Sequence, residues 1–191
     1  MEDLTHRTHL MEMLMATFPS EALSYGTVET PQRVAKMWDE LLKGYEDDPA
    51  VILSKQFDIP GAESDGSTNG IVVVKGIQFY SQCEHHLVPF YGTASIAYLP
   101  RNKVVGLSKF ARLVECYARR LQVQERMTRQ LIDDIVRYLE PLGAMVVVEA
   151  EHMCMTMRGI QKPGTKTVTS RVYGTFADSD KARAEVLALL K

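Results

Sequence analysis

Apolar residues recur along this chain with two different periods. From Val34 to Leu42 they return every three or four positions, a spacing typical of a helix with one buried face. Thr30 is suited to cap this helix, Pro31 to its first position and Gly44 to its end. Elsewhere β-branched and aromatic residues cluster, as they do in strands. The patterns predict helices at 2–17, 30–43, 108–121, 124–139 and 178–191, and strands at 70–81, 91–100, 143–159 and 165–176.

The order of these elements is two helices, two strands, two helices, two strands and a final helix. This order predicts an α+β fold in which the central helix pair packs on an antiparallel sheet. Proline, glycine and acidic residues mark a long irregular stretch at 45–69. We expect one domain over 1–191, with an N-terminal helical segment at 1–45, a core at 70–177 and a C-terminal helix at 178–191.

The composition is that of a globular protein and narrows the class of partner. Apolar residues make up 46% of the 191 positions and charged residues 24%, and the formal net charge is -2. No basic field attracts nucleic acid, and no apolar run reaches the roughly 18 residues of a membrane helix. The cysteines, Cys83, Cys116 and Cys154, are odd in number and widely spaced, which favours a reducing, cytoplasmic location. Cys116 lies within a helical apolar pattern and is interpreted as a core residue.

Chemistry-bearing residues are concentrated in the stretch SQCEHHLVPF, residues 81–90. Cys83 and His86 are three positions apart, so a tight turn can direct both side chains at one point. With Cys154 they would supply two thiolates and an imidazole, a ligand set typical of catalytic zinc with an open fourth position. Iron is an alternative by ligand type. A structural zinc site is the other alternative, with His85 or His152 as the fourth ligand.

The predicted strand at 143–159 carries polar side chains at alternate positions. In a strand, His152, Cys154 and Arg158 would share one face, because successive side chains point to opposite sides. The three methionines between them would then face the core.

Basic residues near a predicted helix start suggest an anion site. Ser108 is suited to be an N-cap, and Lys109 and Arg112 would lie in the first turn. The free N–H groups of a helix start attract phosphate. The alternative is an ordinary solvated face, and the same two interpretations apply to Arg33 and Lys36 on the earlier helix.

An acidic residue opens the helix predicted at 124–139. Glu125 can serve as a capping acid, or as a carboxylate that recognises a nucleobase. The residue pattern leaves both roles open.

Several of these stretches, taken together and in order, resemble the GTP cyclohydrolase I family. The resemblance runs from about Thr30 to Phe176 and rests on TPQRVAKM, CEHH, GLSKFAR, QVQER, HMCMTMRG and TKTVTS. It implies a ββααββ tunnelling fold, in which subunits join their sheets into a ring, usually a toroidal decamer. It also implies conversion of GTP to dihydroneopterin triphosphate.

The resemblance also implies roles for particular residues. Zinc (Zn²⁺) would be held by Cys83, His86 and Cys154, with His85 and His152 as the active-site histidines. Glu125, with Gln124 beside it, would read the guanine. The triphosphate would be contacted by Ser108, Lys109, Arg112 and Arg158, with Arg33 and Lys36 from another subunit.

The implied reaction begins with attack of zinc-activated water on C8 of the guanine ring. His152 would act as general acid at N7, formate would leave after a second hydrolysis, and His85 would move protons in the later steps. Two alternatives remain: a nitrile reductase of the same fold, using a nucleophilic cysteine and NADPH, and a non-catalytic zinc-containing module that binds a purine or pterin.

Overall fold

The structure, a computed structural model, describes residues 2–58 and 70–190. The chain forms two compact units, residues 1–43 and 44–191. Residues 59–69, part of the stretch expected to be irregular, lie outside the described residues. None of the helices in the described part of the chain has both the length and the apolar character that a membrane crossing requires.

The first unit pairs two helices, α1 (Glu2–Met15) and α2 (Thr30–Leu41), joined through the 3₁₀ turns η1 (Ser20–Ala22) and η2 (Tyr25–Thr27). Arg7 of α1 donates hydrogen bonds to the carboxylate of Asp39 and to the carbonyl of Ala35 on α2. The expected cap is wrong, because Thr30 is already helical and the N-cap is Glu29. The helix also ends earlier than predicted, at Leu41.

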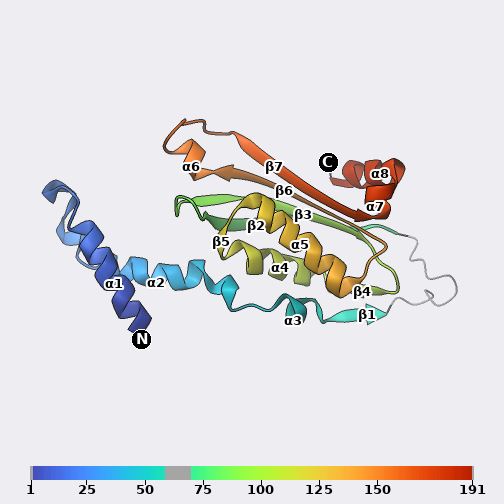
Figure 1. Ribbon diagram of the computed structural model, residues 1–191, viewed down its shortest axis with the longest axis horizontal. Helices are drawn as coiled ribbons and strands as arrows, with labels where there is room; N and C mark the ends of the chain where they lie inside the picture. Colours follow the sequence, from blue (N-terminus) through green and yellow to red (C-terminus); the bar gives the residue numbers. More distant parts are fainter. Residues whose placement is uncertain (1, 59–69, 191) are drawn as a thin grey trace. The chain divides into compact units, whose positions relative to one another are not determined.

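The second unit is built on a five-stranded sheet of order β5-β2-β3-β6-β7 (Figure 1). Its neighbours pair antiparallel, except that β5 runs parallel to β2. Along the chain the main elements follow as ββααββ, which confirms the predicted α+β class and its tunnelling order. Their bounds are β2 (Val72–Cys83), β3 (Pro89–Leu99), α4 (Ser108–Ala118), β5 (Leu121–Gln122), α5 (Gln124–Leu139), β6 (Gly143–His152) and β7 (Lys166–Gly174).

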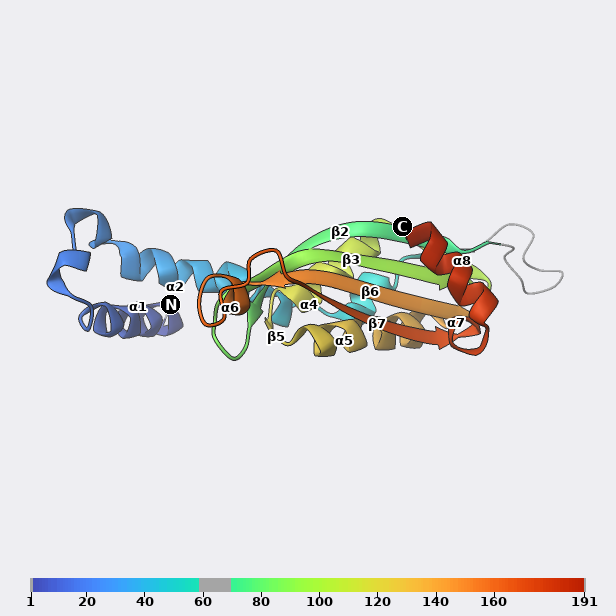
Figure 2. The same ribbon diagram turned by 90° about the horizontal axis from the view of Figure 1, so that it is seen from above.

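Each face of this sheet has its own apolar layer. The pair α4 and α5 covers one face, and α7 (Thr175–Asp178) and α8 (Asp180–Leu190) pack on the other (Figures 1 and 2). Strand β6 serves both layers, because Val146 and Val148 join the first cluster and Met145 joins the second. Because β2 and β6 both run antiparallel to β3, their C-terminal ends lie at the same edge of the sheet.

The last part of the predicted strand 143–159 is wrong. Strand β6 ends at His152, and Met153–Thr156 form the helical turn α6. His152 pairs with Phe90, and the next residue of β3 is Pro89, which has no N–H to donate. On the other side, β7 begins at Lys166, opposite Glu151. Strand β6 therefore has no described strand on either side with which to extend its hydrogen bonding beyond His152.

Two further expectations fail with this strand. His152, Cys154 and Arg158 do not share a face by strand alternation, because two of them lie beyond its end. The intervening methionines are not all core residues, since Met155 is 37% and Met157 61% exposed.

Part of the stretch expected to be irregular is ordered. It contains α3 (Pro49–Leu53) and β1 (Gln56–Asp58), and η3 (Lys43–Tyr45) precedes them. The Asp48 carboxylate accepts a hydrogen bond from the Ala50 N–H at 2.8 Å, so the acidic-proline signal begins a helix instead of a turn. Strand β1 pairs with the short β4 (Lys103–Val105) in a separate sheet.

Candidate active site

The turn between β2 and β3 gathers metal-ligating atoms. Backbone bonds from His86 N and Leu87 N to the carbonyl of Cys83 close it tightly. The Cys83 Sγ lies 3.5 Å from His86 Nδ1 and 3.9 Å from His85 Nδ1. Among the described residues, the ligand atoms of Cys83, His85 and His86 all lie within 4.8 Å of one another. The predicted convergence of Cys83 and His86 is therefore found, and His85 joins it.

Cys154 reaches the same turn from α6. Its thiol forms a side-chain hydrogen bond with Cys83, and burial, together with the charge of that neighbour, raises the pKa of Cys154. It nevertheless stands outside the compact group of Cys83, His85 and His86. Two thiols beside imidazole nitrogens are the donors that zinc prefers, because a bound cation stabilises adjacent thiolates. The residues present fit a zinc ion. Cys83 belongs both to the predicted ligand set with His86 and Cys154 and to the compact group with His85 and His86.

His152, at the end of β6, is held by a buried amide. Gln124 is 1% exposed, and its Nε2 donates to the carbonyls of Val148 and Thr167, each at 3.0 Å. Its Oε1 therefore faces His152 Nε2, at 2.8 Å. An amide oxygen only accepts, so this ring nitrogen carries the proton and Nδ1 is left for other partners.

Two other contacts fix the same arrangement. The His152 ring stacks on Phe90 with centroids 4.7 Å apart and planes 4° apart. Thr169 Oγ1 lies 3.2 Å from Gln124 Nε2 and 2.6 Å from the hydroxyl of Thr128. Burial lowers the pKa of His152, while the charge of Glu125 opposes that effect. None of Phe90, Thr128 and Thr169 was singled out from the sequence, because each contact depends on strand register.

The two residues at the start of α5 have different environments. Glu125 is exposed in the first turn, where its charge acts on His152. The amide of Gln124 has its oxygen and nitrogen bonded within the protein. Gln124 therefore positions His152, while Glu125 is available to a ligand.

The predicted anion-binding residues are divided between two places. Arg158 is exposed just after α6, and its charge acts on Cys154. Ser108 begins α4 but is not its N-cap, which is Leu107, so the predicted capping role is wrong. Lys109 and Arg112 follow in the first turns of α4.

The start of α4 lies far from His152 within one chain. Gln124, the first residue of α5, contacts His152, whereas Tyr138, near the end of α5, accepts a hydrogen bond from Gln56. Gln56 pairs with Val105, just before α4. The span of α5 between these contacts is about 21 Å at a rise of roughly 1.5 Å per residue. Ser108, Lys109 and Arg112 therefore do not join the histidine and thiol cluster of their own chain.

The remaining predicted cations lie on α2 of the first unit. Both Arg33 and Lys36 are exposed. Arg33 forms an ion pair with Glu29 at 2.9 Å and donates to the carbonyl of Gly26.

The chain order ββααββ, with the long strands paired antiparallel and a cysteine and histidine cluster at one end of the sheet, defines a tunnelling-fold protein with a candidate metal centre. A family model described as GTP cyclohydrolase I matches residues 7–191. The chain belongs to the GTP cyclohydrolase I family. The predicted family and its enzymatic activity are thereby confirmed, and the nitrile reductase and the non-catalytic module are not supported.

Two bacterial relatives agree with this assignment. GTP cyclohydrolase 1 of Geobacillus kaustophilus is 56% identical over 167 residues, covering 87% of this chain and 85% of the relative. GTP cyclohydrolase 1 of Bacillus cytotoxicus is 50% identical over 184 residues, covering 96% and 94%. A crystal structure of the archaeosine synthase QueF-Like in the apo form is similar over 56% of this chain and 96% of that chain, at 19% identity and a TM-score of 0.47.

Proposed function

We propose that this GTP cyclohydrolase I opens the guanine ring of GTP at C8, releases formate and closes the product to 7,8-dihydroneopterin triphosphate. The observation that carries the proposal is the meeting of Cys83, His86 and Cys154 at one end of the sheet, beside His152. Zinc held by these three residues would supply the Lewis acidity that activates water. The three free cysteines suit a reducing compartment and support a cytoplasmic location.

His152 is the proposed proton donor to N7 as C8 is attacked. Its Nε2–H is engaged by Gln124, so the proton given to N7 would come from Nδ1 of the doubly protonated imidazolium, which returns to the neutral Nε2–H form. Stacking on Phe90 and the bond to Gln124 hold the ring in one orientation, which removes a reorientation step from the reaction. A positioned general acid contributes roughly 10²–10⁴-fold in rate.

His85 is the proposed carrier of protons in the later steps, when the ribose opens and the new ring closes. It is exposed beside Cys83, so it can reach a substrate that has already lost formate. Glu125 is the proposed reader of guanine, accepting hydrogen bonds from N1–H and the 2-amino group. Adenine lacks this pair of donors, so the carboxylate would discriminate against it.

The triphosphate site is proposed to be shared between copies of the chain. Arg158 stands near Cys154, but Ser108, Lys109 and Arg112 lie toward the other end of α5. A second copy that brings its α4 start to this cluster would complete the site. Such a head-to-tail contact repeats into a ring, which supports a ring-shaped homo-oligomer such as the decamer. Arg33 and Lys36 would come from a further copy.

Mixing two inactive variants tests this shared site. His152→Asn removes the proposed proton donor, and Lys109→Ala combined with Arg112→Ala removes proposed phosphate contacts. Co-expressed copies would recover up to about one quarter of the parent activity, because random mixing pairs the two intact halves at that frequency. No recovery, with both variants folded and assembled, would contradict a site shared between chains.

Incubation with GTP tests the reaction itself. Formate and, after oxidation, a fluorescent pterin should appear in equal amounts. Formate without pterin would show that ring opening is uncoupled from closure, and neither product from zinc-loaded protein would contradict the proposed reaction.

A further inference from the structure

The carboxylate of Glu84 stands between a proposed catalytic histidine and an arginine. Its Oε1 lies 3.8 Å from His85 Nε2, and its Oε2 forms an ion pair with Arg126. The other ring nitrogen of His85, Nδ1, faces Cys83 Sγ at 3.9 Å. The imidazole is therefore flanked by a thiol on one side and a carboxylate on the other, each facing a different nitrogen.

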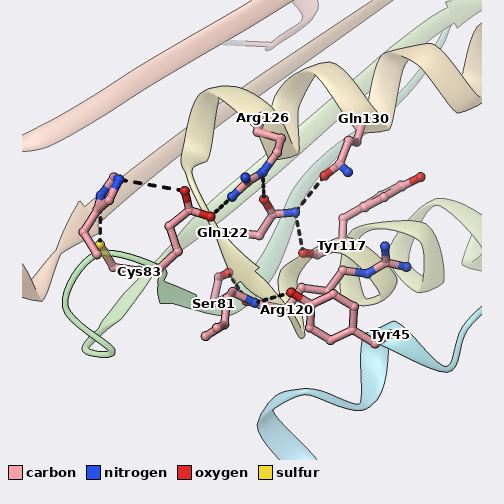
Figure 3. Close-up of polar contacts among 11 residues, drawn as sticks. Tyr45, Ser81, Cys83, Tyr117, Arg120, Gln122, Arg126 and Gln130 are labelled. Atoms are coloured by element: carbon pink, nitrogen blue, oxygen red, sulfur yellow. Dashed lines mark hydrogen bonds and ion pairs between the residues drawn. The ribbon is translucent and has the colours of Figure 1, made fainter.

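The arginine is itself fixed by a buried amide. Arg126 Nε donates to Gln122 Oε1 at 3.1 Å, and Gln122 is buried, at 2% exposure. Its Nε2 donates to Gln130 Oε1 at 2.8 Å and to the carbonyl of Tyr117 at 3.1 Å. The orientation of the Gln122 amide between Arg126 and Gln130 is thus determined (Figure 3). The guanidinium that it holds donates to the Glu84 carboxylate.

The same glutamine also holds the main chain of the turn. The Glu84 N–H donates to the carbonyl of Gln122 at 3.1 Å. Glu84 is therefore anchored twice to one buried residue, through its backbone directly and through its side chain by way of Arg126. This anchoring matters because the His85 side chain is 62% exposed and has few packing contacts to hold its rotamer.

We propose that Glu84, held by Arg126, is a positioning residue that orients His85 for proton transfer. The carboxylate faces Nε2 and favours the ring orientation in which Nδ1 is turned to the metal-binding turn. The side chains of Glu84 and Arg126 are 31% and 37% exposed, so the pair adds little to folding stability. The pair instead acts by orienting the His85 side chain, as residues that contact the ligands of metal and proton-transfer sites do.

This inference rests on the proposed role of His85, and the experiment separates the two. Glu84→Gln, Arg126→Gln, His85→Asn and the double variant Glu84→Gln/His85→Asn are compared for kcat, KM for GTP, zinc per chain and melting temperature. Glu84→Gln and Arg126→Gln should each lower kcat by about 10–100-fold, with KM within about twofold and zinc retained. In the His85→Asn background, Glu84→Gln should change kcat by less than about twofold, because the ring it orients is gone.

Glu115→Gln is the matched control, because Glu115 and Arg119 form an ion pair of similar exposure, 40% and 18%, on α4. It should leave kcat unchanged. A lowered melting temperature with unchanged kcat in Glu84→Gln would overturn the proposal and leave a structural ion pair. Loss of zinc, or an additive loss of kcat in the double variant, would also overturn it. Normal formate and pterin production by His85→Asn would instead refute the role of His85 itself.

Discussion

The two histidines proposed to move protons are held in contrasting ways. His152 lies at a strand end, bonded at 2.8 Å to a buried amide and stacked on Phe90. His85 lies in an exposed turn, with a Glu84 oxygen 3.8 Å from its Nε2 and the Cys83 sulfur 3.9 Å from its Nδ1. An imidazole held in one orientation suits one defined step at N7, whereas a more exposed imidazole suits steps in which the substrate changes shape. Residues that hold His152 should therefore affect both stability and rate, and those that hold His85 mainly rate.

Loss of the thiol at the centre of the proposed zinc site should have the largest effect. Cys83 lies within reach of both His85 and His86 and contacts Cys154. Cys83→Ala should empty the zinc site and reduce formate release to background, because water activation is lost with the metal. Zinc per chain and formate production measure this, and stoichiometric zinc in the variant would contradict the ligand assignment.

Removing the amide that holds His152 should damage stability and rate together. Gln124→Leu leaves the carbonyls of Val148 and Thr167 without this donor. Each unsatisfied group costs about 1–3 kcal/mol, and an unanchored ring should lower kcat by roughly 10–100-fold. Thermal unfolding and steady-state kinetics provide the measurement. If kcat fell with no loss of stability, Gln124 would resemble Glu84 and the contrast between the two histidines would fail.

The close approach of β3 and β6 beside His152 should tolerate no added side chain. A Cβ on Gly92 would lie 1.9 Å from the carbonyl oxygen of Glu149. Gly92→Ala forces the two strands apart and should destabilise the fold by about 1–3 kcal/mol. Gly70→Ala, which meets nothing within 4 Å, is the control. Equal melting temperatures for the two variants would contradict the tight approach.

Removing one hydroxyl behind Gln124 should have the smallest effect. Thr169→Val deletes a contact to Gln124 Nε2, but that nitrogen keeps its bonds to two carbonyls. The expected cost is about 0.5–1.5 kcal/mol of stability, with kcat within about threefold. A larger fall in kcat, measured beside that of Gln124→Leu, would mean that the hydroxyl and not the carbonyls orients the amide.

Local features of the site could be predicted from the sequence, and those that depend on register could not. Cys83 and His86 meet because a turn of a few residues joins them, so their spacing was informative. Gln124 and His152 are far apart in sequence, and their contact requires the pairing of β6 with β7 and the placement of α5.

The end of β6 shows the same limit. The alternation of polar and apolar residues from His152 to Arg158 was compatible with a strand. In the structure, however, the residue of β3 that would pair next, after Phe90, is Pro89. The proline was visible in the sequence, whereas the residue opposite it was not. The division of the predicted phosphate-binding residues was likewise hidden, because it depends on the direction of α4 and α5 across the sheet.

Zinc content in two variants of neighbouring residues tests the central claim most directly. Cys154 is assigned to the metal and His152 to proton donation, although only one residue separates them. Cys154→Ala should lose zinc and all ring opening. His152→Asn should keep near-stoichiometric zinc and its fold while formate release falls roughly 10²–10⁴-fold. Loss of zinc from His152→Asn comparable to that from Cys154→Ala would contradict the account and favour a structural site with His152 as a ligand.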